Sequence, residues 1–176
     1  RDKLVQIRTL LRNSNTQASI GSGFFVSADG LIVTNFHVAS QLALEPERYS
    51  GAYVTIDGQE GAVELLAFDV QRDLAVLRAK NRTAPAPVLE FRPAAEAMAQ
   101  GERIYSLGNP LDIGFAVTEG TYNGLVRRSF YPRIFFGGAL NPGMSGGPAV
   151  DDAGRVLGVN VAKRLDGEQV SFLIPA

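Results

Sequence analysis

Short apolar runs, separated by glycine, proline and acidic residues, recur along the whole chain and most constrain its fold. No long stretch shows the sustained 3.6-residue periodicity of an amphipathic helix. Many short strands with turn residues between them are typical of a β-barrel or β-sandwich, so the sequence predicts an all-β fold. The expected strands are residues 4–10, 23–27, 31–35, 52–57, 62–68, 74–79, 103–107, 115–127, 133–136, 148–151, 155–161 and 170–174.

Turn residues and a proline-rich segment divide these strands into two sets. Residues 27–30 and 151–154 are predicted hairpin turns, because aspartate and glycine tolerate the backbone angles of tight turns. A short helical turn is expected after His37. Residues 81–100 contain three prolines and many alanines, so they are interpreted as a connection. Within it, 94–100 could form a short helix or a loop.

Composition excludes several function classes. The chain has 176 residues, 45% of them hydrophobic and 20% charged, which suits one domain or two tightly fused barrels. Its net charge of −1 provides no electrostatic footprint for nucleic acid or an anionic membrane. No apolar run approaches the length of a membrane span. The absence of cysteine excludes disulfides and thiol nucleophiles, and the single histidine argues against a transition-metal site. No metal or cofactor is expected.

Three separated strings carry the residue types that activate a serine nucleophile. They are Val33-Thr34-Asn35-Phe36-His37-Val38, Arg72-Asp73-Leu74-Ala75-Val76-Leu77 and Asn141-Pro142-Gly143-Met144-Ser145-Gly146-Gly147-Pro148. A serine hydroxyl is a weak nucleophile at neutral pH, and histidine is suited to take its proton. A carboxylate then orients the imidazole. His37 is the only histidine, so it would be the base, Ser145 the nucleophile and Asp73 the orienting residue.

Each of these residues also has a plainer interpretation. Ser145 could lie in an ordinary glycine-serine turn, His37 could be structural, and Asp73 could cap the strand that follows it. Asp69 competes with Asp73 for the role of the carboxylate. Because the glycines around Ser145 permit unusual backbone angles, the N–H groups of Gly143 and Ser145 could converge as an oxyanion hole.

Together the three strings resemble the chymotrypsin-fold serine proteases, and within them the HtrA/Deg branch. Further segments are similar to that branch: Gly21-Ser22-Gly23-Phe24-Phe25-Val26, Gly30-Leu31-Ile32-Val33-Thr34-Asn35, Leu107-Gly108-Asn109-Pro110, Val117-Thr118-Glu119-Gly120 and Phe172-Leu173-Ile174-Pro175. The resemblance covers almost the whole chain. It implies two six-stranded antiparallel β-barrels with the active site between them, the first in 1–80 and the second in 101–176, joined by 81–100. It also implies a serine endopeptidase that cleaves unfolded or damaged polypeptides in the periplasm or another envelope compartment.

Met144 departs from the pattern of the branch, which usually has asparagine or aspartate at this position. Backbone donors form the oxyanion hole, so methionine need not abolish it. Methionine does remove a side-chain hydrogen bond that could hold the loop. We therefore expect residues 135–144 of the isolated domain to sample an unformed oxyanion hole. The aromatic residues Phe130, Tyr131, Phe135 and Phe136 are expected to pack in the core or in loops beside the site.

The specificity pocket is inferred from the resemblance alone. Ala139 stands six residues before the serine, at the position of the pocket base, so no preference for arginine or lysine at the cleavage site is expected. Leu140 and the strand segment Asn160-Val161-Ala162-Lys163 are expected to line the entrance. That strand would also pair with the substrate backbone as an added β-strand. Lys163 could lie at the rim or point to solvent.

Two other functions stay open. A non-catalytic peptide-binding module would keep the cleft but lack a competent loop, and Met144 favours that reading. A latent protease would need a partner, or a further domain such as the PDZ domain of HtrA-type proteins, to order its loop. Oligomer formation is open too, because trimers of the family use N-terminal aromatic residues and 1–11 contains none. The chain shows no signal peptide and is interpreted as an excised domain.

Overall fold

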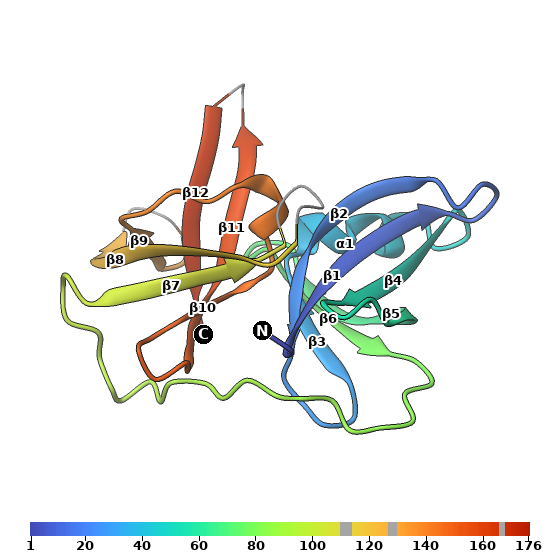
Figure 1. The fold of residues 1–176 in the computed structure, drawn as a ribbon. Helices are drawn as coiled ribbons and strands as arrows, with labels where there is room; N and C mark the ends of the chain where they lie inside the picture. Colours follow the sequence, from blue (N-terminus) through green and yellow to red (C-terminus); the bar gives the residue numbers. More distant parts are fainter. Residues whose placement is uncertain (110–113, 127–129, 166–167) are drawn as a thin grey trace.

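The computed structural model describes residues 1–109, 114–126, 130–165 and 168–176, which fold into two closed antiparallel β-barrels of six strands each (Figure 1). The predicted all-β double barrel is confirmed. The first barrel contains β1 (Leu4–Leu11), β2 (Gln17–Phe25), β3 (Leu31–Thr34), β4 (Tyr49–Thr55), β5 (Glu60–Asp69) and β6 (Leu74–Ala79). The second contains β7 (Arg103–Gly108), β8 (Ala116–Val126), β9 (Arg133–Phe136), β10 (Pro148–Val150), β11 (Val156–Leu165) and β12 (Glu168–Pro175).

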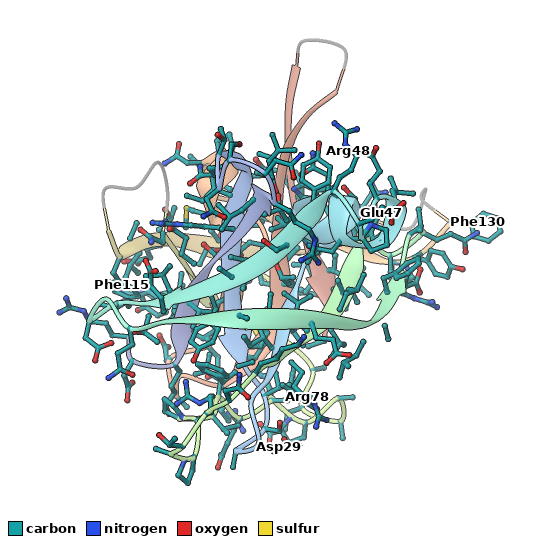
Figure 2. All side chains as sticks on the ribbon, turned by 90° about the vertical axis from the view of Figure 1, so that its right-hand side faces the viewer. Asp29, Glu47, Arg48, Arg78, Phe115 and Phe130 are labelled. Atoms are coloured by element: carbon teal, nitrogen blue, oxygen red, sulfur yellow. The ribbon has the colours of Figure 1, made fainter. Side chains whose placement is uncertain are left out.

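The first barrel closes in the order β1-β2-β3-β6-β5-β4, with β4 pairing back to β1. Successive side chains of a strand face opposite sides, so every second residue of β6 points inward. Ala75, Leu77 and Ala79 are accordingly buried, against Ile7 and Phe25 of neighbouring strands. The turn at 27–30 forms as expected, and its Asp29 lies 3.6 Å from Arg78 of β6 (Figure 2).

The helical turn expected after His37 is the helix α1 (Phe36–Leu44), which packs on the first barrel through Val38 and Ala39. Among the described residues, no helix combines the length and the apolar character that crossing a bilayer requires.

The second barrel closes in the order β10-β11-β12-β9-β8-β7. Its interior is filled mainly by aliphatic side chains with one aromatic ring: Ile104, Ile134, Phe136, Leu140, Met144, Ala149, Leu157, Ala162 and Leu173. Strand β11 runs four residues beyond its predicted end, because its pairing with β12 continues through polar residues as far as Leu165. Strand β2 likewise begins six residues early, since Gln17 and Ser19 pair with β1 without belonging to an apolar run.

The connection between the barrels crosses below both of them and is fastened to the second (Figure 1). Phe91 forms a bridge with Val156, and the backbone N–H of Arg92 donates to the Val156 carbonyl at 2.7 Å. The Arg92 guanidinium lies 3.5 Å from the buried Asp151 carboxylate, which also binds Arg155 at 3.0 Å. Residues 94–100 form turns and no helix.

Candidate active site between the two barrels

His37 and Asp73 meet because their strands are neighbours in the first barrel. Strands β3 and β6 run antiparallel with Thr34 opposite Ala75, so the end of β3 lies against the start of β6. His37 follows β3, and Asp73 precedes β6. The His37 Nδ1 atom lies 2.7 Å from Asp73 Oδ2, and the His37 backbone N–H donates to Asp73 Oδ1 at 2.8 Å. The carboxylate therefore holds both the imidazole and the first turn of α1.

Asp73 is fixed by its own backbone as well. It adopts a left-handed conformation with φ of 57°, which aspartate tolerates better than most residues. The Asn35 Nδ2 atom donates to the Asp73 carbonyl at 2.9 Å, which ties the two strand ends together. Asp69 is occupied elsewhere. Hydrogen bonds from the Arg72 backbone and then from its guanidinium lower the pKa of the Asp69 carboxyl. The carboxylate beside His37 is thus Asp73.

Ser145 lies at the other side of the interface, after the 3-10 turn η2 (Pro142–Met144) and before β10. Its side chain is buried, and its Oγ donates to the Ala162 carbonyl at 2.6 Å and accepts from the Ala162 N–H at 2.9 Å. Among the described residues no hydrogen bond joins Ser145 to His37. The loop is nevertheless docked on the first barrel, because the Ser22 N–H donates to the Ser145 carbonyl at 2.8 Å.

The backbone of η2 determines which N–H groups are free. The Met144 N–H donates to the Asn141 carbonyl at 2.9 Å, and the Ser145 N–H donates to the Pro142 carbonyl at 3.1 Å. The Ser145 N–H is therefore already bonded within the loop. In this conformation it does not converge with the Gly143 N–H on an open oxyanion site.

Two glycines after the serine are required by close contacts. Gly146 has φ of 87°, and a Cβ there would lie 2.2 Å from the Ser22 carbonyl oxygen. A Cβ on Gly147 would lie 2.1 Å from the Leu107 carbonyl oxygen. Any side chain at either position would push the serine loop away from both barrels. The glycine-rich string thus reflects a tightly docked loop.

The expectation that no side chain supports the serine loop is wrong, because the Met144 side chain anchors it by packing. Its side chain is fully buried in the second barrel beside Leu140, and its backbone and side chain pack so closely over Gly108 that a Cβ there would lie 2.8–3.1 Å from them. The Thr118 hydroxyl points to its Sδ at 3.8 Å. Methionine therefore anchors the loop by packing, a contact that the sequence pattern alone does not reveal.

The residues expected to line the pocket entrance lie in different environments. Ala139 is exposed. Leu140 does not line an entrance, because only 1% of it is exposed and it fills the core of the second barrel. Val161 and Ala162 are buried as well, and Ala162 reaches Ser145 through its backbone. The expectation for the Lys163 side chain falls outside the described part of the chain.

Asn160 also departs from its expected place at the entrance. Its side chain is fully buried, and Nδ2 donates to the Leu107 and Pro148 carbonyls at 3.0 and 3.4 Å. Its backbone carbonyl accepts from the Gly146 N–H, and its N–H donates to the Gly147 carbonyl. Asn160 therefore supports the serine loop from below rather than facing a substrate.

A cavity of about 640 Å³ opens beside Asp73 between the two barrels. Tyr131 forms one wall, with its Oη 2.5 Å from Gln71 Oε1 and its ring 3.9 Å from the Arg72 guanidinium. Phe130 projects from the same loop and is 93% exposed (Figure 2). Ser145 does not line this cavity, so it flanks the His37–Asp73 pair without containing the nucleophile.

One residue that the sequence did not single out belongs to the site. Ser22 is fully buried in β2, and its Oγ donates to the Gly143 carbonyl at 2.7 Å and accepts from the Asn109 N–H at 2.9 Å. The only sequence signal is a polar residue between two glycines, directly before the apolar residues Phe24 and Phe25.

Comparisons with known proteins identify the family of the chain. Residues 21–159 match the family described as Trypsin-like peptidase domain. The chain is 35% identical over 164 residues to the putative serine protease HhoB of Synechocystis sp., covering 88% of this chain and 37% of that protein. It is 33% identical over 171 residues to a probable periplasmic serine endoprotease DegP-like of Halomonas elongata, covering 93% and 34%.

The solved structure of Deg5 is similar over the whole fold, with a TM-score of 0.84, 26% identity, and coverage of 99% of this chain and 83% of that one. The chain spans about a third of the length of the two curated relatives. The sequence matches and the double barrel indicate the same family. The chain belongs to the trypsin-like peptidase family and is a chymotrypsin-fold protease domain of the HtrA type.

Proposed function

We propose that this domain is a serine endopeptidase in which Ser145 attacks the scissile carbonyl, His37 is the general base and then the general acid, and Asp73 orients His37. The observation that carries the proposal is the 2.7 Å contact between His37 Nδ1 and Asp73 Oδ2 on the barrel to which the serine loop is docked by the Ser22 N–H. The family to which the chain belongs supports the same chemistry.

The His37–Asp73 contact supports a different role for each of the two nitrogen atoms of the imidazole. A carboxylate at Nδ1 favours the tautomer that carries its proton there, which leaves Nε2 to accept the proton of a serine hydroxyl. The same carboxylate stabilises the imidazolium that forms during attack. The side chain of His37 is 32% exposed, so it stays within reach of a substrate.

Two local rearrangements would bring the serine loop into a reactive state. Ser145 Oγ leaves the Ala162 backbone by rotation about its Cα–Cβ bond, a move between staggered rotamers. The Pro142–Gly143 peptide turns and releases the Ser145 N–H from the Pro142 carbonyl. The freed Gly143 and Ser145 N–H groups would then form the oxyanion hole. A substrate strand that binds only the rearranged loop would shift the population towards it.

The substrate class follows from the way an extended chain pairs with a sheet edge. A folded protein hides its backbone, whereas an unfolded or damaged polypeptide can add a strand beside β11. We extend the proposal to such substrates and to the periplasm or another envelope compartment, since the Halomonas relative is named a periplasmic serine endoprotease. No cofactor or metal is part of this mechanism. Homo-oligomer formation and contacts with further domains of a longer protein stay predictions.

Hydrolysis of unfolded casein and of short peptides tests the proposal. Ser145→Ala and His37→Ala should each remove turnover while leaving the fold intact. Asp73→Asn should lower kcat on the order of 10⁴-fold, because the imidazole loses its correct tautomer. Asp69→Asn is the matched control, since that carboxylate binds Arg72, and it should retain turnover. A larger loss of turnover in Asp69→Asn than in Asp73→Asn would show that the proposal names the wrong carboxylate.

A further inference from the structure

Ser22 lies where the first barrel meets the serine loop, and all of its polar groups are bonded. The residue belongs to β2 and is fully buried. Its N–H donates to the Ser145 carbonyl at 2.8 Å, and its carbonyl accepts from the Thr34 hydroxyl at 2.7 Å. The Ser22 backbone thus connects the serine loop to the strand that leads to His37.

The Ser22 hydroxyl reaches two segments of the second barrel. It donates to the Gly143 carbonyl at 2.7 Å and accepts from the Asn109 N–H at 2.9 Å. Gly143 belongs to η2, and Asn109 directly follows β7. A buried hydroxyl that satisfies both a donor and an acceptor is costly to remove, because each partner is left without a hydrogen bond. The hydroxyl therefore joins the first barrel to both the oxyanion loop and the end of β7.

The hydrogen bond from Ser22 Oγ holds the peptide of η2 that directly follows the one that must turn. Releasing the Ser145 N–H requires rotation of the Pro142–Gly143 peptide, whose carbonyl accepts from it. The next peptide, Gly143–Met144, carries the carbonyl held by Ser22 and the N–H held by the Asn141 carbonyl. Ser22 thus fixes the peptide next to the one that turns. Gly143 lies between them, and glycine permits the change of φ.

From this arrangement we infer that Ser22 is a positioning residue for the oxyanion hole, acting through the Gly143 carbonyl. The inference rests on the proposed function, because it assigns Ser22 a task in the attack by Ser145. The hydroxyl keeps the Gly143–Met144 peptide in place while the preceding peptide turns, so that the Gly143 N–H reaches its working direction. Without it, the loop rotates as a whole and the two donors seldom converge.

The test compares Ser22→Ala with Ser106→Ala. Ser106 is also a fully buried serine, on β7, but its hydroxyl has no hydrogen-bond partner among the described residues. Each variant is measured in two ways: labelling of Ser145 by a fluorophosphonate probe together with peptide hydrolysis, and hydrogen exchange of residues 140–147. Ser22→Ala should lower kcat and the labelling rate by about 10- to 100-fold. KM should change by less than about threefold, and exchange of the loop should rise.

Ser106→Ala should match the parent in both measurements. Labelling of Ser22→Ala at the rate of Ser106→Ala would overturn the inference, as would slower labelling with unchanged loop exchange. If the parent itself is not labelled, the proposed function fails, and the exchange measurement still reports whether Ser22 holds the loop. If Ser22→Ala does not fold, Ser22→Cys takes its place, because a thiol is only a weak donor and should give an intermediate loss.

Discussion

At the scale of single residues, Met144 combines two effects on the serine loop. Its buried side chain fixes the η2 turn against Gly108 and the core of the second barrel. In that turn the Ser145 N–H is bonded to the Pro142 carbonyl. The packing that stabilises the domain therefore also stabilises a loop conformation without an open oxyanion site. Loss of this packing should therefore both destabilise the fold and release the loop from this conformation.

Replacing Met144 by asparagine tests this coupling. Met144→Asn should lower the free energy of unfolding by about 2–5 kcal/mol, because a buried methionine leaves a cavity behind. It should also raise kcat for a short peptide more than it lowers KM, since the resting turn loses its anchor. Met144→Leu, which conserves volume, should cost less than about 1.5 kcal/mol and leave kcat near the parent value. Denaturant unfolding and peptide kinetics measure both; equal kcat in all three proteins would contradict the coupling.

At the scale of elements, the turn between η2 and β10 is a docking surface for two strands. The turn combines a left-handed glycine with backbone atoms of β2 and β7 that lie so close that a Cβ on Gly146 or Gly147 would overlap them. Gly146 is constrained both by its positive φ and by the lack of space for a side chain. The two constraints can be separated because Gly154 has only the positive φ. Gly154 has φ of 77° in the 151–154 hairpin, and nothing lies within 4 Å of a Cβ built there.

The pair Gly146→Ala and Gly154→Ala measures the two constraints. Gly154→Ala should cost about 1–3 kcal/mol in unfolding free energy, which is the strain of an alanine at positive φ. Gly146→Ala should cost clearly more, because its methyl group would overlap the Ser22 carbonyl oxygen and the Thr34 hydroxyl. It should also abolish peptide hydrolysis, which Gly154→Ala should retain. Similar losses in both variants would show that the turn can move aside.

Sequence patterns predicted elements best where apolar residues coincide with strands. The bounds of β6 and β9 match the predicted ones, because their apolar residues alternate into the two cores. The strings around His37, Asp73 and Ser145 contain residues that lie where the two barrels meet, and their catalytic roles stay predictions. The first six residues of strand β2 and the role of Ser22 were missed, since both depend on contacts that strand pairing creates and that no local apolar pattern reveals. The burial of Leu140 was missed for the same reason.

At the scale of the whole molecule, an ion-pair cluster fastens the connection to the second barrel. Arg92 lies within the connection and Glu102 lies just after it, while Asp151 and Arg155 belong to the 151–154 hairpin and its end. Burial raises the pKa of the Asp151 carboxyl, but hydrogen bonds from the Arg155 backbone and guanidinium outweigh this and hold the pKa below its ordinary value of 3.8. Ionised Asp151 therefore stabilises the folded state.

The sign of the pH dependence follows from that lowered pKa. The contribution of Asp151 is complete above pH 3.8 and is lost as the pH falls through the lower value of the folded protein. Asp151→Asn should cost about 1–3 kcal/mol at pH 7, and the difference from the parent should shrink in acid. Asp152→Asn removes the same charge at an exposed position and should change little. Denaturant unfolding at several pH values measures this; a difference that grows in acid would contradict the assignment.

Labelling with a fluorophosphonate probe, followed by mass spectrometry of the labelled peptide, tests the central claim most directly. The reaction needs a nucleophile, a base and an oxyanion site together, so it reports the whole arrangement between the barrels. The account predicts a single adduct on Ser145, which forms slowly because the Ser145 N–H is bonded to the Pro142 carbonyl and which is absent in Ser145→Ala and His37→Ala. An adduct on another serine, or labelling that persists in His37→Ala at the parent rate, would contradict it.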